Sequence, residues 1–219
     1  MSVAAARRSV AFNSLAGQWS SIGVSLVGAA YAVALIVGFV TRGLSSPIVD
    51  PLLAIMELLT TIAAPLLLVM MAAIHGRASN ERPLAGLVAL VFMALATGIT
   101  SVVHFVQLTA MRQLGTAGLV WPSPLYAAEL LAWDVFVGLS LVFAACALET
   151  TRGHRLARIG LLTCGVLCLF GVLGPASGRM RLQFVGVFGY GVVLPVVCLS
   201  VSDVFRHDRA LTVWPDPKA

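Results

Sequence analysis

Charged side chains are scarce in this sequence of 219 residues: they make up 11% of it, whereas hydrophobic residues make up 59%. A soluble domain averages about 25% charged and about 45–50% apolar residues. The shortage of charge therefore excludes a water-soluble globular domain, a disordered chain and a nucleic-acid-binding module. The net charge of +5 does not change this, because the basic residues stand at the ends of apolar runs. We expect a multi-pass membrane protein whose main partner is the lipid bilayer and which binds no nucleic acid.

Motifs of catalysis and cofactor binding are also lacking. No Gly-rich phosphate loop follows a strand, and no serine or cysteine nucleophile elbow is present. Neither an HExxH motif nor a paired-histidine spacing occurs, so we expect no metal and no cofactor. The four cysteines are too few for a disulfide scaffold, and we interpret Cys164 and Cys168 as small packing residues of an apolar run.

The sequence does contain six long apolar runs, each a candidate helix across the membrane. A helix that crosses about 30 Å of hydrocarbon needs about 20 residues, and the run from Ile159 reaches this length only if it continues to Ser177. Continuous apolar runs favour helices over strands. The predicted fold class is therefore all-α, a polytopic bundle over residues 21–205 between tails at 1–20 and 206–219. The predicted spans are Ser21–Thr41, Leu52–His75, Leu84–Leu108, Leu125–Leu148, Ile159–Pro175 and Leu182–Phe205.

The basic residues predict which side of the membrane each chain end occupies. Ten of them fall in the two tails and in the connections after the second and fourth runs, against four in the other connections. Positive residues stay in the cytoplasm, so both termini are predicted to be cytoplasmic, as an even number of crossings requires. Thirteen of the 14 basic residues are arginine, and together with the high alanine content this suggests a GC-rich bacterial genome and a bacterial inner membrane.

Ionisable side chains inside the apolar runs carry the chemical information. A charged group near the bilayer centre costs a few kcal/mol or more, so it usually faces a partner or water. Glu57, His104 and Glu129 each stand about five residues from the outer end of a run, which places them about 7–8 Å below the outer interface. Asp134 lies deeper, at about 15 Å. We expect three helices to bring acids and one imidazole into the outer half of the bilayer.

The third run carries a polar stripe within about 120° of one helix face. Its members are Thr97, Thr100, Ser101, His104 and Gln107. Since most of the remaining surface of this helix is apolar, the stripe is predicted to face other helices or a cavity rather than lipid.

Helical spacing also separates the two acids of the fourth run. Asp134 points about 140° away from Glu129, so both acids reach one cavity only if that helix is largely enclosed by protein. In the last run, Pro195 follows a glycine-rich stretch and removes a backbone donor, which predicts a kink with Tyr190 near the bend. In the first run, the small-residue row Ala30, Ala34 and Gly38 suits close helix packing or a homo-oligomer face.

The polar residues admit three interpretations. They could form a pocket open to the outside that binds, senses or moves a small ligand or a proton. They could belong to an intramembrane enzyme acting on a lipid or isoprenoid, with His104 and an acid as a general acid–base pair, although the sequence favours a protein that is not an enzyme. They could also only fasten helices together in an accessory membrane subunit without its own site. The candidate site residues are His104, Asp134, Glu129, Glu57, Gln107, Ser101 and Tyr190.

Two stretches carry a resemblance to known proteins. They are 125–134, which reads LYAAELLAWD, and 189–195, which reads GYGVVLP. In these motifs and in its six-span layout the chain resembles small multi-pass bacterial membrane proteins of unassigned function. The resemblance implies an inner-membrane location rather than an activity.

Overall fold

The computed structural model describes residues 3–43, 46, 48–78, 82–115, 118, 120–149 and 152–213, and no β-strand occurs among them. Six helices in these ranges are long and apolar enough to cross a membrane. They coincide with the six predicted runs, which confirms the all-α polytopic fold of an integral membrane protein. The six spans are Ala11–Arg42, Leu52–Arg77, Pro83–Met111, Pro124–Ala147, Arg155–Ser177 and Met180–His207.

Beyond the second span, each span combines more than one helical element. The first helix begins at Val3, so it extends ahead of Ser21 into the predicted N-terminal tail. In chain order the elements are α1 Val3–Arg42, α2 Leu52–Arg77, α3 Pro83–Val106, the π-helical η1 Gln107–Met111, α4 Pro124–Leu130, the π-helical η2 Leu131–Val137, α5 Gly138–Ala147, the 3₁₀ turn η3 Arg152–His154, α6 Arg155–Gly171, α7 Leu173–Ser177, the 3₁₀ turn η4 Met180–Gln183, α8 Phe184–Phe188, the π-helical η5 Gly189–Val193 and α9 Leu194–Val213.

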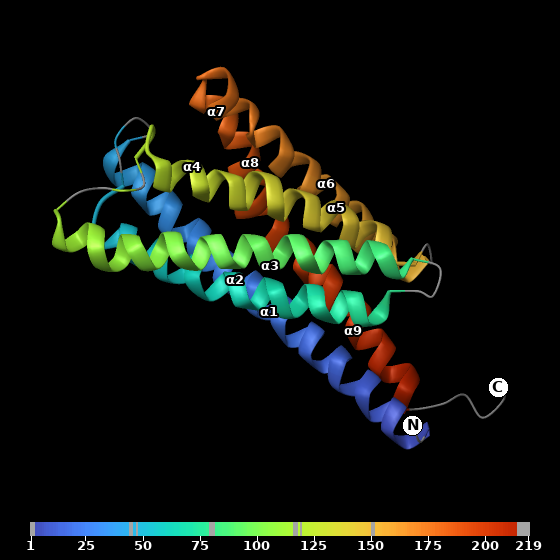
Figure 1. Ribbon diagram of the computed structural model, residues 1–219. Coiled ribbons are helices and arrows are strands. Elements are labelled where there is room, and N and C mark those ends of the chain that lie inside the picture. Colours follow the sequence, from blue (N-terminus) through green and yellow to red (C-terminus); the bar gives the residue numbers. More distant parts are fainter. Residues whose placement is uncertain are drawn as a thin grey trace.

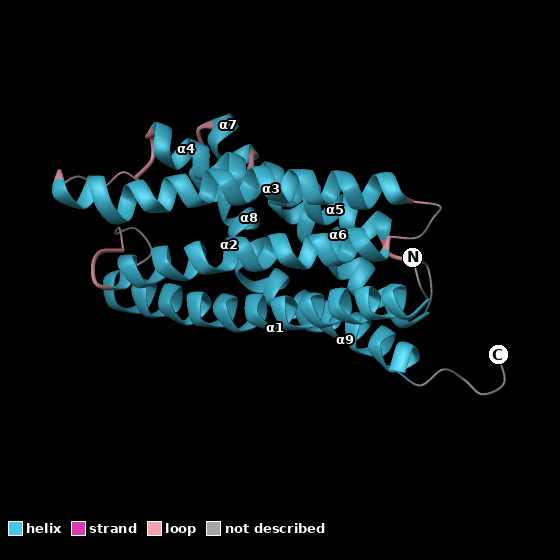
Figure 2. Cartoon of the chain, turned by 60° about the horizontal axis from the view of Figure 1, so that its bottom comes forward, coloured by secondary structure: helices cyan, strands magenta, loops and turns pink. Residues whose placement is uncertain are grey.

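The helices form one bundle with both chain termini at the same end (Figure 1). We call this the terminal end and the opposite one, where α1 ends and α4 begins, the distal end. α1 packs along α2 and α9, α3 packs against α2 and α5, and α6 packs against α5, α8 and α9. Figure 2 shows α2 between α1 and α3. The even number of crossings places the start of α1 and the end of α9 at the same end, and these two helices also pack against each other.

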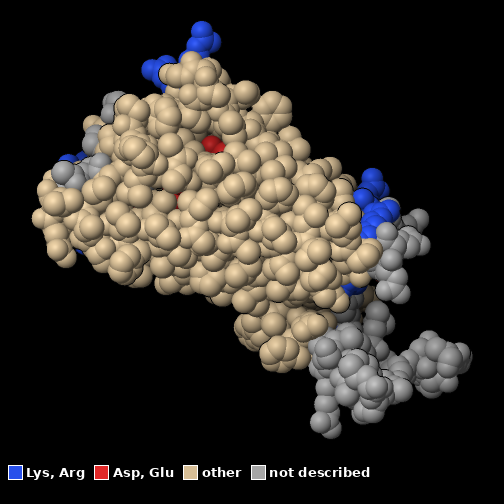
Figure 3. Space-filling model, viewed as in Figure 1, with Lys and Arg blue, Asp and Glu red and all other residues tan. Residues whose placement is uncertain are grey.

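The outside of the bundle is apolar. Leu26, Val40, Val102, Phe105 and Leu156 are each more than 60% exposed. Figure 3 shows an uncharged belt with Lys and Arg side chains gathered at its ends, and acidic atoms appear only as small red spots within it. An exposed apolar belt of this kind matches the hydrocarbon of a bilayer, where helices satisfy their own backbone polar groups.

The last span, in which a kink is predicted, contains a π-helical segment, η5, that ends at Val193, two residues before Pro195. The Ser25 hydroxyl of α1 donates to the carbonyl oxygen of Pro195 at 2.6 Å. A Cβ on Gly28 would lie 2.3 Å from Cγ of Pro195, so glycine allows α1 to contact the proline directly. From the predicted small-residue row, Gly38 packs within the chain, because a Cβ there would lie 2.7 Å from Cδ1 of Ile48.

The fourth and fifth spans approach each other through a pair of glycines. A Cβ on Gly165 of α6 would lie 2.7 Å from the carbonyl oxygen of Gly138 and 3.0 Å from the amide nitrogen of Val142 in α5. These neighbours are backbone atoms, which cannot rotate away as a side chain can. The absence of a Cβ at Gly165 therefore sets the distance between α5 and α6.

Gly165→Ala is expected to lower the free energy of unfolding by about 1–3 kcal/mol, because an added methyl group overpacks a close contact. Thermal unfolding of the purified protein in detergent measures the change. The matched control is Gly98→Ala, at a position where a Cβ meets nothing within 4 Å. Equal thermal midpoints for the two variants would contradict the close approach of α5 and α6.

At the terminal end, His154 links the second span to the start of the fifth. An Arg77 Nη2 group donates to Nε2 of His154 at 3.2 Å, and the His154 side chain is buried. Burial and the neighbouring Arg77 guanidinium lower the pKa of His154 below its ordinary value of 6.5. The folded protein therefore holds this imidazole in its neutral form, in which Nε2 can accept a hydrogen bond.

The stability of the protein is expected to decrease as the pH falls through about 6.5, because the unfolded chain then binds a proton that the folded chain disfavours. His154→Gln keeps a hydrogen-bond acceptor for Arg77 and cannot titrate. We therefore expect a flatter plot of thermal midpoint against pH for this variant than for the wild type. The same acid slope in both proteins would show that His154 does not contribute to it.

Candidate functional site

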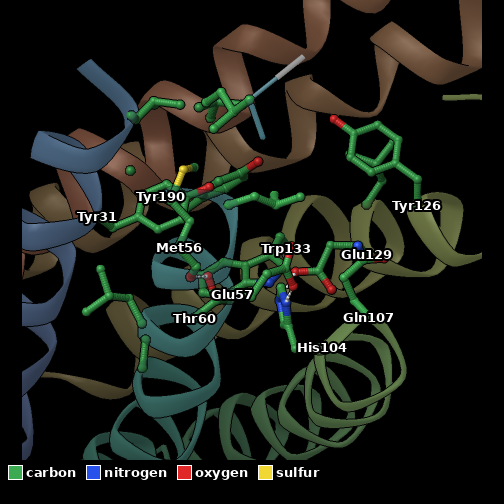
Figure 4. A pocket seen from close by; sticks show the side chains of 18 of the residues that line it. Tyr31, Met56, Glu57, Thr60, His104, Gln107, Tyr126, Glu129, Trp133 and Tyr190 are labelled. Atoms are coloured by element: carbon green, nitrogen blue, oxygen red, sulfur yellow. Dashed lines mark hydrogen bonds and ion pairs between the residues drawn. The ribbon is translucent and has the colours of Figure 1, made fainter. Parts of the chain in front are cut away.

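Three predicted residues from three spans meet near the distal end. His104 of α3 forms hydrogen bonds through both ring nitrogens, from Nδ1 with Oε2 of Glu57 in α2 and from Nε2 with Oε1 of Glu129 in α4, the latter at 2.8 Å. Glu57 and His104 are 4% exposed, and the side chain of Glu129 is 13% exposed. Figure 4 shows the three side chains pointing toward one another. We call this group the Glu–His–Glu triad.

The start of the fourth span positions Glu129. Ser123 caps α4, since its hydroxyl oxygen accepts a hydrogen bond from the amide of Tyr126 at 3.1 Å, and Pro124 occupies the first helical turn. The preceding loop is held against the third span, because the Gly118 amide donates to Oε1 of Gln107 at 3.1 Å. Gln107 therefore connects the loop before α4 to the helix that carries His104.

Hydrogen-bond chemistry sets the lowest number of protons that the triad holds. A neutral imidazole has one donor nitrogen and one acceptor nitrogen, whereas an ionised carboxylate only accepts. The fewest protons that satisfy the hydrogen bonds at both nitrogens of His104 are those of an imidazolium between two carboxylates, or of a neutral imidazole with one protonated carboxyl. Both arrangements hold the same number of protons and leave a net charge of −1. The triad is thus a buried negative charge with one transferable proton.

A cavity of about 1010 Å³, which we call the distal cavity, lies beside the triad, between the first, second, third, fourth and sixth spans. All three tyrosines of the chain line it, together with Trp133. The rings of Trp133 and Tyr190 pack with their centroids 5.2 Å apart, and the Tyr190 hydroxyl accepts a hydrogen bond from Nε2 of Gln183 at 3.0 Å. The cavity therefore combines aromatic walls with one buried charge.

The mouth of the cavity carries an exposed ion pair. Nη2 of Arg112 donates to Oδ1 and Oδ2 of Asp50 at 2.6 and 2.7 Å. Both side chains are solvated, with exposed fractions of 40% and 55%. This pair is neutral as a unit, in contrast to the triad below it.

Of the predicted site residues, His104, Glu57, Glu129, Gln107 and Tyr190 line this cavity. Asp134 and Ser101 are not among the described residues that line the cavity. Helical spacing predicted that Asp134 and Glu129 point to different sides of the fourth span, and in the structure only Glu129 of the two lines the cavity. Two of the lining tyrosines, Tyr31 and Tyr126, were not predicted; a tyrosine inside or beside an apolar run was the signal that could have indicated them.

Asp134 lies on the opposite side of the fourth span, fully buried against the fifth and sixth spans. A Cβ on Gly171 would lie 2.8 Å from its Oδ1, and a Cβ on Gly186 would lie 2.5 Å from the same atom, so both glycines are needed to make room for the carboxyl group. The Gln183 amide is close by, but neither carboxyl oxygen has a hydrogen-bond partner in the described part of the chain.

Other polar residues of the spans fasten helices, as one of the three interpretations proposed. The Thr97 hydroxyl donates to the carbonyl oxygen of Ala64 at 3.1 Å, and the Ser140 hydroxyl donates to that of Ala89 at 2.7 Å. The Cys164 thiol donates to the carbonyl oxygen of Gly189 at 3.1 Å. Each bond joins two different spans. The fastening role therefore applies to these residues, whereas the triad also borders a cavity.

Within the described ranges, no group of three or more His, Cys, Asp and Glu side chains is arranged to hold a metal ion. Both nitrogens of His104 are already engaged by carboxylates. Comparisons with protein-family models, with curated proteins and with solved structures found no match for the chain. The resemblance carried by 125–134 and 189–195 thus stays an expectation.

A double-mutant cycle tests the pairing of Glu57 with His104. Either His104→Leu or Glu57→Leu alone is expected to lower the free energy of unfolding by about 3–5 kcal/mol. His104→Leu leaves both carboxylates without the imidazole, and Glu57→Leu leaves Nδ1 of His104 buried without its partner. The double variant removes both polar groups, so its loss is expected to be clearly smaller than the sum. Thermal and denaturant unfolding in detergent measure the three values.

Glu57→Leu combined with Ser140→Ala is the control, because Ser140 bonds elsewhere, to Ala89. These two losses are expected to add. Additive losses in the Glu57/His104 cycle as well would contradict a direct bond between the two side chains.

Proposed function

We propose that this integral membrane protein binds a small molecule in the distal cavity and that binding is linked to the proton of the Glu–His–Glu triad. The observation that carries the proposal is the position of the triad: both ring nitrogens of His104 face carboxylates at the wall of a cavity of about 1010 Å³. Transport or sensing would follow from such binding if the site exchanges its ligand or changes conformation.

The size and lining of the cavity support ligand binding. Small-molecule sites are mostly apolar cavities of about 300–1,000 Å³ with a few polar groups that fix orientation. This cavity lies at the upper end of that range, and the triad is among the polar groups that line it. Its walls come from five spans, so a bound molecule would contact most of the bundle.

Hydrogen bonding around His104 favours binding over catalysis. A general base must have a nitrogen free to take a proton from the substrate. Both nitrogens of His104 are engaged by side chains of this chain. The proton of the triad is therefore better placed to respond to a charge in the cavity than to be transferred to a reacting group.

The arginine distribution supports cytoplasmic termini in a bacterial inner membrane. In that orientation the distal cavity opens on the side away from the cytoplasm. A ligand would then enter from outside the cell or from the outer leaflet of the membrane.

A panel of three probes of similar size tests the proposal: phenethyltrimethylammonium, its neutral isostere with carbon in place of nitrogen, and a phenylalkanoate anion. At least one is expected to raise the thermal midpoint of the purified protein, since a ligand stabilises the state that binds it. Ala63→Phe fills part of the cavity and should abolish the shift. Ala72→Phe adds the same ring on the exposed face of α2 and should retain it.

The stabilisation is also expected to vary with pH in the wild type and to lose this dependence in Glu129→Gln, which keeps the shape of the side chain without its charge. Two outcomes count against the proposal. Either none of the three probes shifts the midpoint of the wild type, or the shift is the same in Ala63→Phe.

A further inference from the structure

We infer that the ligand of the distal cavity is a monovalent organic cation that carries an aromatic or aliphatic body. This inference rests on the proposed function and names the class of ligand for the same site. Three observations lead to it: the net charge of the triad, the aromatic side chains that line the cavity, and the pairing of Asp50 with Arg112 among the remaining charged groups.

The first observation is an uncompensated negative charge. In either arrangement that satisfies the hydrogen bonds of His104 with the fewest protons, the triad has a net charge of −1. Oε2 of Glu129 is buried and has no hydrogen-bond partner among the described residues. A buried carboxylate without a full set of partners is destabilised, so a positive charge next to Glu129 would relieve this cost.

The second observation is the aromatic lining. Tyr31, Trp133 and Tyr190 come from three different spans and line the cavity, with Trp133 beside the triad (Figure 4). The faces of such rings attract a cation, most strongly where water is excluded. A carboxylate together with several aromatic rings is a binding environment for an organic ammonium group rather than for an anion.

The third observation is the charge of the remaining lining groups. Asp50 and Arg112 neutralise each other at the mouth. Arg181 lies exposed at the rim, where water and salt screen it, and the tyrosine hydroxyls are uncharged near neutral pH. The titratable groups that face the cavity besides the triad are Tyr31, Asp50, Arg112, Tyr126, Arg181 and Tyr190. The buried triad therefore sets the sign of the charge that the ligand carries.

A proton and a cation would compensate the same charge. If the triad takes up one further proton, its net charge becomes zero and the attraction for a cation is lost. A cation that binds to the triad with a charge of −1 therefore competes with that proton. Acidification should weaken cation binding, and binding of the cation should release a proton at low pH.

Calorimetric titration of the purified full chain with phenethyltrimethylammonium tests the inference, because this probe has no group that titrates. The wild type is expected to bind it at least about tenfold more tightly than its neutral isostere. Below the pH at which the triad takes up its further proton, the Kd should rise about tenfold for each unit of acidification. Glu129→Gln should raise the Kd for the cation at least about tenfold and leave the Kd for the neutral isostere unchanged.

Asp203→Asn is the matched control, since it removes an exposed carboxylate paired with Arg206 in α9, outside the cavity. It should bind the cation as the wild type does. Trp133→Leu retains the triad but removes an aromatic ring, so it should weaken binding of the cation, while the Kd should still depend on pH. This variant keeps the inference testable if Glu129→Gln does not fold.

Two results would overturn the inference. In the first, the neutral isostere binds as tightly as the cation, its affinity depends on pH, and its binding is lost in Ala63→Phe. This result would leave the proposed function intact and refute the cationic ligand. Binding of the phenylalkanoate in preference to the cation would do the same. Failure of all three probes to bind would contradict the proposed function itself.

Discussion

The distal half of the bundle depends on the two hydrogen bonds of the His104 imidazole, because they join α3 to α2 and to α4. Glu57 and His104 are almost fully buried, so neither can exchange its partner for water. These hydrogen bonds therefore fix how α2, α3 and α4 are rotated about their own axes. The same orientation of the three helices forms the wall of the cavity. The same hydrogen bonds leave one negative charge in the membrane, which ties the packing of the helices to the chemistry of the site.

The two sides of the fourth span differ in packing. Toward α6 and α8, Gly138, Gly165, Gly171 and Gly186 allow close approach, and Asp134 is enclosed there without access to water. Toward α1 and α2, the fourth span borders the cavity. One side of the fourth span is thus tightly packed and the other side borders the cavity. Trp133, next to Asp134 in sequence, lines the cavity.

Hydropathy predicted the six spans because each must bury about 20 residues in hydrocarbon whatever its neighbours are. Helical spacing also separated Asp134 from Glu129 and grouped His104 with Gln107. It could not identify partners, since spacing gives the face of a helix and not the helix opposite. The π-helical segments η1 and η2 depend on tertiary packing and have no sequence signal of their own here. The sequence also did not predict that Tyr31 lines the cavity, because most of the other lining residues lie far from it in the sequence.

The central claim is that a proton and an organic cation compensate the same buried charge. Calorimetry of phenethyltrimethylammonium binding in buffers with different ionisation enthalpies counts the protons exchanged for each cation bound. At a pH where the triad is neutral, the wild type is expected to release one proton and Glu129→Gln none. Cation binding without any proton exchange over the whole accessible pH range would contradict this claim.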